Sequence, residues 1–359
     1  MCDMTNQLTI LVLCGGQSTE HEISLLSARN VIENLDTKKY HVSVAKIEQD
    51  GTWHYFKTAQ DFFSHSKSHL INITPGQKNP FSIDGKTLEI DCIFPVLHGT
   101  NGEDGTMQGL LELLQMPYVG AETLGSAIAM DKDISKRLMR AAGISVVDWK
   151  LLRKSDAKIN YADVKKELGE LLFIKPNSLG SSVGTSKVTD EKSFYAAIAE
   201  AFRFDEYILI EKAIVGREIE CSVLGNENPK ASLPGEIINH TEFYTYDAKY
   251  IDDDGATVKT PADLSSELTT QIKTTAIKAF CALRCCGMAR VDFFLEKNNK
   301  LYVNEINTIP GFTNISMYPK NWEASGLQYS ALLDELIALG IKRFEFKQSL
   351  IRVFQPVQV

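Results

Sequence analysis

The sequence has no lysine- or arginine-rich run and no leader of positive charge before its first apolar segment. That segment, residues 8–14, is also too short for a bilayer, which takes about 20 apolar residues. The formal net charge of −8 disfavours a basic surface for nucleic acid or an anionic membrane. We therefore expect a cytosolic protein that has neither nucleic acid nor membrane as a partner.

Cysteine pairs of the CxxC type are missing as well, although the chain has seven cysteines. An odd number of cysteines, mostly in apolar segments, is typical of reduced and buried thiols rather than of disulfides or a zinc site. The chain also lacks long polar or repetitive windows, so long disorder is excluded. Its 359 residues leave room for two or three compact domains.

The N-terminal part of the chain alternates strand, glycine turn and helix. Residues 8–14 form a continuous apolar run that ends at Gly15-Gly16, as expected of a buried parallel strand. Thr19 and Glu22 have capping-box spacing and predict a helix after this turn. Residues 1–130 are therefore predicted to form a doubly wound α/β domain with a parallel sheet. Its other predicted elements are strands over 42–47 and 90–97 and a helix after residue 105.

Two further α/β domains are predicted, over residues 131–215 and 216–359. The first opens with a basic amphipathic helix that ends at Gly143, and the second contains an omega-like lid loop at about 240–261. The predicted strands are 171–175, 207–211, 218–224, 289–295 and 301–306, and the predicted helices are 265–285 and 327–339.

Four polar residues on two successive strands give the strongest local signal. Arg290 and Asp292 share one face of their strand, and Glu305 and Asn307 share one face of the next. If the strands pair as a hairpin, two carboxylates and one amide oxygen converge, which suits Mg²⁺. A charged solvent face is the alternative, but apolar neighbours on both strands favour metal binding.

A glycine- and serine-rich loop, residues 180–184, resembles a phosphate cradle. Such a cluster is usually a plain loop, but Lys175 and Lys132 precede it as plausible phosphate cations. The Walker pattern GxxxxGK[ST] is missing, so a nucleotide would be held by another fold. Further along, Glu211-Lys212 ends an apolar strand. These two residues are either charged residues at an exposed strand end or part of an adenine-binding site, and the sequence favours neither.

Polar residues also follow predicted strands of the first domain, where open α/β sheets bind ligands. Glu20 is a candidate acid for a substrate ammonium and His98 a polar orienting group, whereas Glu22 and Glu103 are interpreted as helix N-terminal acids. Gly311, in a turn beside Arg290, is either a plain turn residue or part of an oxyanion hole.

The motifs GGQSTEHEISL, HGTNGEDG, KPNSLGSSVG, EKAIVGRE, YDAKY, RVDFF and NEINTIPGFTNIS together resemble the D-alanine–D-alanine ligase family of the ATP-grasp superfamily. The match runs in order over residues 8–339. The resemblance implies three α/β domains with ATP between the central and C-terminal ones, and a homodimer. It implies ATP-dependent joining of two D-alanine molecules through D-alanyl phosphate, for peptidoglycan precursor synthesis, with two Mg²⁺ ions that Mn²⁺ can replace.

The resemblance also implies a role for each site residue. Catalytic roles fall to Glu20, Ser181, Tyr250, Arg290 and Gly311. Substrate binding is implied for Glu20, His98, Lys249, Arg290, Gly311, Ser316 and Met317. ATP binding is implied for Lys132, Lys175, Ser181, Ser182, Glu211, Lys212, Ile214, Glu218 and Lys249. The implied metal ligands are Asp292, Glu305 and Asn307.

Two positions bear on the choice within the family. Some relatives carry a carboxylate where this chain has Leu179, which leaves loop latching through that side chain open. Tyr250 favours a dipeptide over D-alanyl-D-lactate.

The alternatives are another ATP-grasp carboxylate–amine ligase, including a D-alanine–D-lactate enzyme, and a non-catalytic nucleotide-binding protein. A nicotinamide dehydrogenase is disfavoured because GxGxxG spacing is missing.

Overall fold

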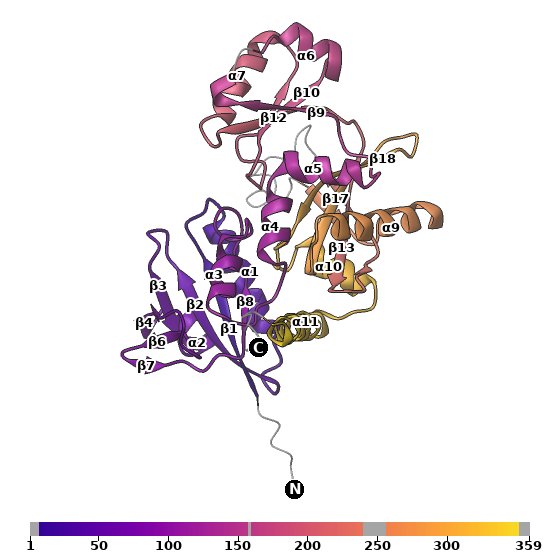
Figure 1. The fold of residues 1–359 in the computed structure, drawn as a ribbon. Helices are drawn as coiled ribbons and strands as arrows, with labels where there is room; N and C mark the ends of the chain where they lie inside the picture. The colour runs from indigo at the N-terminus through magenta and orange to yellow at the C-terminus, as the bar shows by residue number, and fades with distance from the viewer. Residues whose placement is uncertain (1–6, 157–158, 240–255, 352–359) are drawn as a thin grey trace, which may run out of the picture.

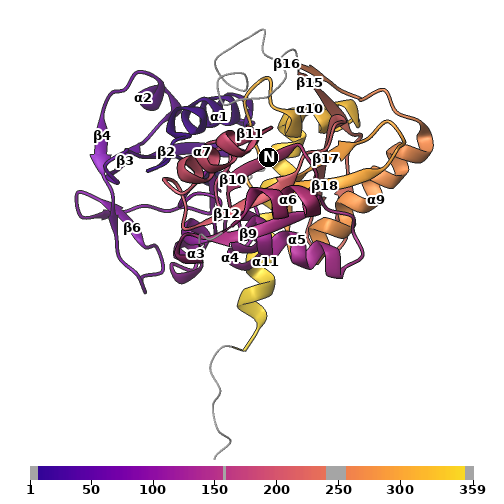
Figure 2. The same cartoon turned by 90° about the horizontal axis from the view of Figure 1, so that it is seen from above.

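The computed structural model describes residues 7–156, 159–239 and 256–351, which form three α/β units, each around a sheet of its own (Figure 1). The N-terminal unit lies at the lower left of Figure 1, the central unit at the top and the C-terminal unit at the right. Figure 2 shows the central unit lying across the junction of the other two. The domain boundaries after residues 130 and 215 stay a prediction. Most of the predicted lid loop lies outside the described residues.

The N-terminal sheet is built around β1 (Leu8–Gly15), whose central residues are completely buried. β1 pairs in parallel with β2 (Tyr40–Ile47) on one side and with β8 (Cys92–Pro95) on the other, so the predicted parallel sheet is confirmed. Antiparallel β3 (Trp53–Phe56) and β4 (Ser68–Leu70), which the sequence analysis did not predict, extend the sheet to the order β4-β3-β2-β1-β8.

Helix α1 (His21–Asn34) follows β1 after a short turn. The predicted capping box of Thr19 and Glu22 is wrong, because Glu20 occupies the N-cap position and its side chain turns toward the central unit instead of capping the helix. The other elements of this unit are α2 (Ala59–Phe63), α3 (Thr106–Leu113) and a small sheet of β5 (Asn72–Ile73), β6 (Phe81–Ile83) and β7 (Lys86–Thr87).

Two helices lead from the N-terminal unit to the central one. α4 (Thr123–Met130) and α5 (Lys132–Ala141) both pack against the C-terminal sheet, and the Asp131 carboxylate caps α5. The central sheet is antiparallel, in the order β11-β10-β12-β9. Its strands are β9 (Trp149–Arg153), β10 (Leu172–Pro176), β11 (Ser186–Val188) and β12 (Tyr207–Lys212), and its helices are α6 (Tyr161–Leu168) and α7 (Glu191–Ala201).

The C-terminal sheet has the order β16-β15-β13-β17-β18, with β14 paired to β13. Burial alternates along the second half of β17, which places Val291 and Phe293 in the core and Arg290 and Asp292 on the opposite face. The elements are β13 (Arg217–Gly225), β14 (Lys230–Ala231), β15 (Gly235–Asn239), β16 (Ala256–Lys259), α9 (Ser266–Ala282), β17 (Gly287–Leu295), β18 (Leu301–Asn307) and α10 (Met317–Ala324).

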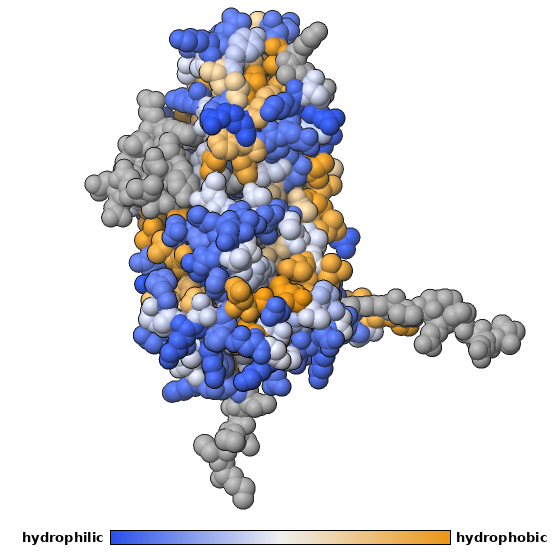
Figure 3. Space-filling model, turned by 90° about the vertical axis from the view of Figure 1, so that its left-hand side faces the viewer, coloured by the Kyte–Doolittle hydropathy of each residue, from blue (hydrophilic) through white to orange (hydrophobic). Residues whose placement is uncertain are grey.

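Helix α11 (Tyr329–Ser349) packs against α1, β8 and β17 and so joins the C-terminal unit to the N-terminal one. It runs ten residues beyond its predicted end, because Gly340 is a close-packing residue rather than a cap: a Cβ there would lie 2.5 Å from the Tyr118 carbonyl oxygen. No helix in the described ranges is both long and apolar enough to cross a membrane. The face seen in Figure 3 is mostly hydrophilic, with small apolar patches.

Candidate active site

Strands β17 and β18 carry the polar centre of the site. Their antiparallel register sets Arg290 opposite Asn307 and Asp292 opposite Glu305. The Arg290 guanidinium forks onto Asp292, with Nε donating to Oδ1 at 2.7 Å and Nη2 donating to Oδ2 at 2.6 Å. The same Nε lies 2.9 Å from Oε2 of Glu220 on β13. The four residues that were predicted to converge therefore do so.

The donor set on these strands fits Mg²⁺. Across the described ranges, His, Cys, Asp and Glu side chains do not gather in groups of three or more that would suit a metal held by protein ligands alone. Asp292, Glu305 and Asn307 instead offer a few hard oxygens, as Mg²⁺ requires when waters and phosphates complete its shell. Asn307 Nδ2 donates to Asp292 at 3.2 Å, and a half-turn of that amide would present its oxygen instead. Asp292 keeps lone-pair sites beyond those that Arg290 uses.

Glu20 and Ser181 connect the N-terminal unit to the glycine- and serine-rich loop. Ser181 Oγ donates a short hydrogen bond to Glu20 Oε1. Gly99 makes room for this carboxylate, because a Cβ at its φ of +74° would lie 2.8 Å from Glu20 Oε2. Ser181 itself has a φ of +52°, which is unfavourable for a residue with a side chain. Lys132 Nζ holds the loop at a second point, donating to the Leu179 carbonyl at 2.6 Å, so the loop is anchored without a carboxylate at position 179.

Glu103 belongs to the same cavity, although the sequence analysis interpreted it as a helix N-terminal acid. It is buried, and its Oε1 accepts a hydrogen bond from the Gly99 N–H at 3.0 Å. Burial, followed by the neighbouring Glu20 charge, raises the pKa of Glu103 to about 8. Burial and the Glu20 charge therefore both favour the neutral form of the Glu103 carboxyl. Its glycine-rich surroundings, HGTNGEDG, were the signal for an inward turn, but the sequence alone does not show which acid points inward.

His98 is buried at the cavity and is fixed by two contacts. Because the Ile309 carbonyl can only accept, the His98 Nδ1 carries the proton and donates at 3.1 Å. Nε2 is then the acceptor for Ser27 Oγ at 3.0 Å. Burial lowers the pKa of His98, which agrees with a neutral ring. Both ring nitrogens are therefore hydrogen-bonded to protein groups, and His98 connects the Ile309 turn to Ser27 of α1.

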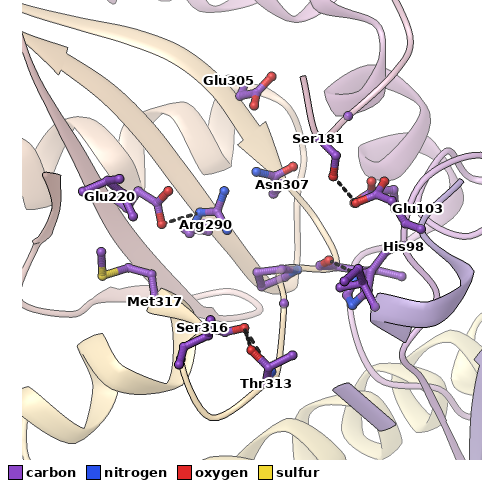
Figure 4. A pocket seen from close by; sticks show the side chains of 18 of the residues that line it. His98, Glu103, Ser181, Glu220, Arg290, Glu305, Asn307, Thr313, Ser316 and Met317 are labelled. Atoms are coloured by element: carbon purple, nitrogen blue, oxygen red, sulfur yellow. Dashed lines mark hydrogen bonds and ion pairs between the residues drawn. The ribbon is translucent and has the colours of Figure 1, made fainter. Parts of the chain in front are cut away.

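The turn after β18 brings Gly311 and Ser316 together, and Ser316 is seen beside Thr313 in Figure 4. A Cβ on Gly311 would lie 2.7 Å from Ser316 Oγ, so a side chain there would displace the hydroxyl. Ser316 Oγ accepts from the Thr313 N–H at 3.0 Å and pairs with its hydroxyl at 2.8 Å. Met317 lies buried at the start of α10 and lines the same cavity. In Figure 4, Thr313, Ser316 and Met317 lie at the lower left and His98 lies at the right, and Arg290 and Asn307 lie above them.

Three buried charges lie beneath the loop, on the side of the central sheet. Lys175 Nζ is 2.8 Å from Glu211 Oε2 and 3.4 Å from Asn304 Oδ1. The other oxygen of Glu211 lies 2.7 Å from the Lys136 ammonium. Although burial acts against the charged forms, the two lysines hold the pKa of Glu211 below its usual range, and Glu211 raises that of Lys175.

The cavity itself is lined by nine of the predicted residues, from all three units. These are Glu20, His98, Ser181, Arg290, Glu305, Asn307, Gly311, Ser316 and Met317. The predicted ATP residues Lys132, Lys175 and Glu211 are buried beside it, and Ser182 follows Ser181 in the loop. Lys212, Ile214 and Glu218 lie where β12 passes into β13. Lys249 and Tyr250 lie outside the described residues. Glu103, Lys136 and Glu220 were not predicted.

Comparisons with known proteins agree with this arrangement. The family models "D-ala D-ala ligase N-terminus" and "D-ala D-ala ligase C-terminus" match residues 9–121 and 138–338. A D-alanine–D-alanine ligase of Coxiella burnetii is 52% identical, covering 98% of each chain. A solved D-alanine–D-alanine ligase from that organism superposes with a TM-score of 0.89 at 50% identity, covering 96% of this chain and 97% of its own.

Two more distant structures share the fold. The VanG D-Ala:D-Ser ligase from Enterococcus faecalis is 35% identical, with a TM-score of 0.85 and coverage of 93% of this chain and 99% of its own. The D-alanine–D-alanine ligase from Bacillus anthracis complexed with ATP is 31% identical, with a TM-score of 0.73 and coverage of 95% and 99%. The fold is therefore the ATP-grasp fold, and the chain belongs to the D-alanine–D-alanine ligase family.

Proposed function

We propose that the protein joins two D-alanine molecules to D-alanyl-D-alanine, converting ATP to ADP and phosphate, as a step in peptidoglycan precursor synthesis. The observation that carries this proposal is the cavity where all three α/β units meet. It combines an acid for an ammonium group, a guanidinium beside a glycine turn, and metal-binding oxygens, next to buried lysines. This combination suits amide formation from two amino acids and ATP.

The first half-reaction makes D-alanyl phosphate, because a carboxylate is too poor an electrophile to react with an amine. The buried carboxylate of Glu20 binds the ammonium of the first D-alanine. Lys132 and Lys175 bind the phosphates of ATP, and the Ser181-Ser182 loop covers them. Mg²⁺ held by Asp292, Glu305 and Asn307 supplies charge neutralisation when it is bound. The D-alanine carboxylate then attacks the γ-phosphorus in line, and ADP leaves.

The second half-reaction forms the amide. The amine of the second D-alanine attacks the acyl carbon, and the Arg290 guanidinium and the Gly311 N–H stabilise the oxyanion of the tetrahedral intermediate. Phosphate then leaves. The attacking amine must first lose a proton, since α-amino groups titrate near pH ~8. We assign the proton to Tyr250 or to the departing phosphate, and the binding of the second D-alanine to Ser316 and Lys249.

We further propose a homodimer in the cytosol, the usual assembly implied by the family. Thiols rather than disulfides support the location: four of the cysteines, Cys14, Cys92, Cys221 and Cys285, are buried and unpaired as thiols. The dimer is tested by light scattering, which should give twice the chain mass. A mass of one chain at micromolar concentration would contradict it.

The proposed reaction is tested with purified protein, Mg-ATP and candidate acceptors. D-Alanine alone should give equal amounts of ADP, phosphate and dipeptide, whereas D-lactate added as a second substrate should give no depsipeptide between pH 6 and 9. An Asp292→Ala variant should lose turnover. A variant with full turnover would show that Asp292 is not needed, and no turnover by the unmodified protein would support a protein in which ATP is bound without this chemistry.

A further inference from the structure

Lys136 is a completely buried lysine that the proposed reaction does not use. It lies on α5 one turn after Lys132, so both side chains leave the same face of the helix. Lys132 reaches the cavity loop, but Lys136 is 0% exposed and its ammonium is enclosed. A side chain with no exposure has no direct route to a nucleotide.

The groups around Lys136 stabilise a positively charged ammonium. Its Nζ lies 2.7 Å from Glu211 Oε1, donates to the Val147 carbonyl at 3.3 Å and stands 5.6 Å from the centre of the Trp149 ring. A buried ammonium is costly unless it is paired, so three favourable contacts at one Nζ indicate a selected position for the charge. Burial lowers the pKa of Lys136 to about 8 in spite of the Glu211 carboxylate.

Glu211 divides its two oxygens between two lysines. Oε1 faces Lys136 from α5, and Oε2 faces Lys175 from the neighbouring strand β10. The antiparallel register of β10 and β12 sets Lys175 and Glu211 on the same face of the central sheet. Lys136 therefore stands behind Glu211, on the far side from Lys175.

We propose that Lys136 is a positioning residue of the nucleotide site, which fixes Glu211 so that Glu211 in turn holds the Lys175 ammonium at the phosphates of ATP. This inference rests on the proposed ATP-dependent function. Without Lys136, one oxygen of a buried carboxylate loses its partner. Either both oxygens of Glu211 then compete for Lys175, or Glu211 takes up a proton and no longer holds the Lys175 ammonium. In both cases Lys175 leaves its present position. If Glu211 stays ionised, the net positive charge of residues 136, 175 and 211 also falls.

The test uses full-length protein and a Lys136→Met variant, which keeps most of the unbranched side chain and removes its charge. Binding of the non-hydrolysable ATP analogue adenylyl imidodiphosphate with Mg²⁺ is measured by calorimetry, without turnover. We expect the Kd to rise about 10- to 100-fold, the range known for residues that support metal ligands from behind. The KM for D-alanine at saturating ATP should change less than about twofold. A general loss of structure would instead change both the Kd for the analogue and the KM for D-alanine.

Lys150→Met is the matched control, because Lys150 lies on β9 of the same sheet and pairs at 2.5 Å with Glu167 near the surface. Its Kd should equal that of the unmodified protein. If Lys136→Met does not fold, Lys136→Gln takes its place, because its side chain is polar but is uncharged and one atom too short to replace the ion pair with Glu211. An unchanged Kd in a folded variant, or loss of folding in both variants, would overturn the positioning role. If the unmodified protein itself failed to bind the analogue, the proposed function would fail instead.

Discussion

Phe312 follows Gly311 in the proposed oxyanion turn and packs against residues of both the N-terminal and the C-terminal unit. Its ring is 0% exposed and meets Phe94 of β8 edge-on, with 5.9 Å between ring centres, and Tyr318 of α10 at 5.5 Å. The backbone is held too: its carbonyl accepts from Asn30 Nδ2 at 2.7 Å and from Tyr329 Oη at 2.8 Å. Gly311, immediately before it, is thereby fixed in place.

A Phe312→Ala substitution should lower the free energy of unfolding by about 3–5 kcal/mol, the usual loss for a buried phenylalanine. We expect the upper half of that range, since each aromatic pair adds about 0.5–1.5 kcal/mol beyond area burial. Phe312→Leu, which keeps most of the apolar volume, should lose less than about 2 kcal/mol. In the folded Phe312→Ala protein, kcat should fall, because the Gly311 N–H is displaced from the position of the oxyanion.

The assay is guanidinium unfolding followed by intrinsic tryptophan fluorescence, to which Trp322 of the same buried cluster contributes, together with phosphate release. Phe346→Ala is the matched control, because Phe346 is 60% exposed on α11 and its loss should change stability by less than about 0.5 kcal/mol. Equal stability of the Phe312→Ala and Phe346→Ala proteins would show that the buried ring of Phe312 stabilises the fold no more than an exposed one.

Three further predictions follow from the site. Because the folded-state pKa of Glu103 is raised to about 8, the free energy of unfolding should fall as pH rises from 5 to 8 by up to about 1.4 kcal/mol per unit, and urea titrations of Glu103→Gln should lack this slope. Ser181→Ala should raise the KM for D-alanine and for ATP in steady-state assays, since it removes the hydrogen bond to Glu20, while changing stability by no more than about 1.5 kcal/mol. Asp292→Asn should need at least about tenfold more Mg²⁺ for half-maximal phosphate release; an unchanged Mg²⁺ titration would remove Asp292 from the ligand set.

Much of this architecture could be predicted because it depends on local pattern. The apolar run of β1 reflects burial of both faces of that strand, and the alternation along β17 reflects burial of one face. Short edge strands such as β3 and β4 have too few residues for a clear period. The continuation of α11 beyond residue 339 depends on the close contact of Gly340 with Tyr118, which lies far away in the sequence.

The site residues that were missed depend on partners far away in the sequence. Lys136 has the sequence setting of a solvated residue on a basic helix, and its buried charge is paired with Glu211 on β12 of the central sheet. Glu103 has the setting of an acid before a helix, and its raised pKa depends on Glu20. Arg290 and Asp292 were found because both lie on one strand, where the period of two already places them together.

The most direct test of the proposed function is a product assay with D-alanine as the only amino acid. Purified protein with Mg-ATP should form D-alanyl-D-alanine, ADP and phosphate in a ratio of about one to one to one, as the acyl-phosphate route requires. With [¹⁸O]carboxylate-labelled D-alanine, one labelled oxygen per turnover should appear in the released phosphate. Phosphate that carries no label, or ATP hydrolysis without dipeptide, would contradict this account.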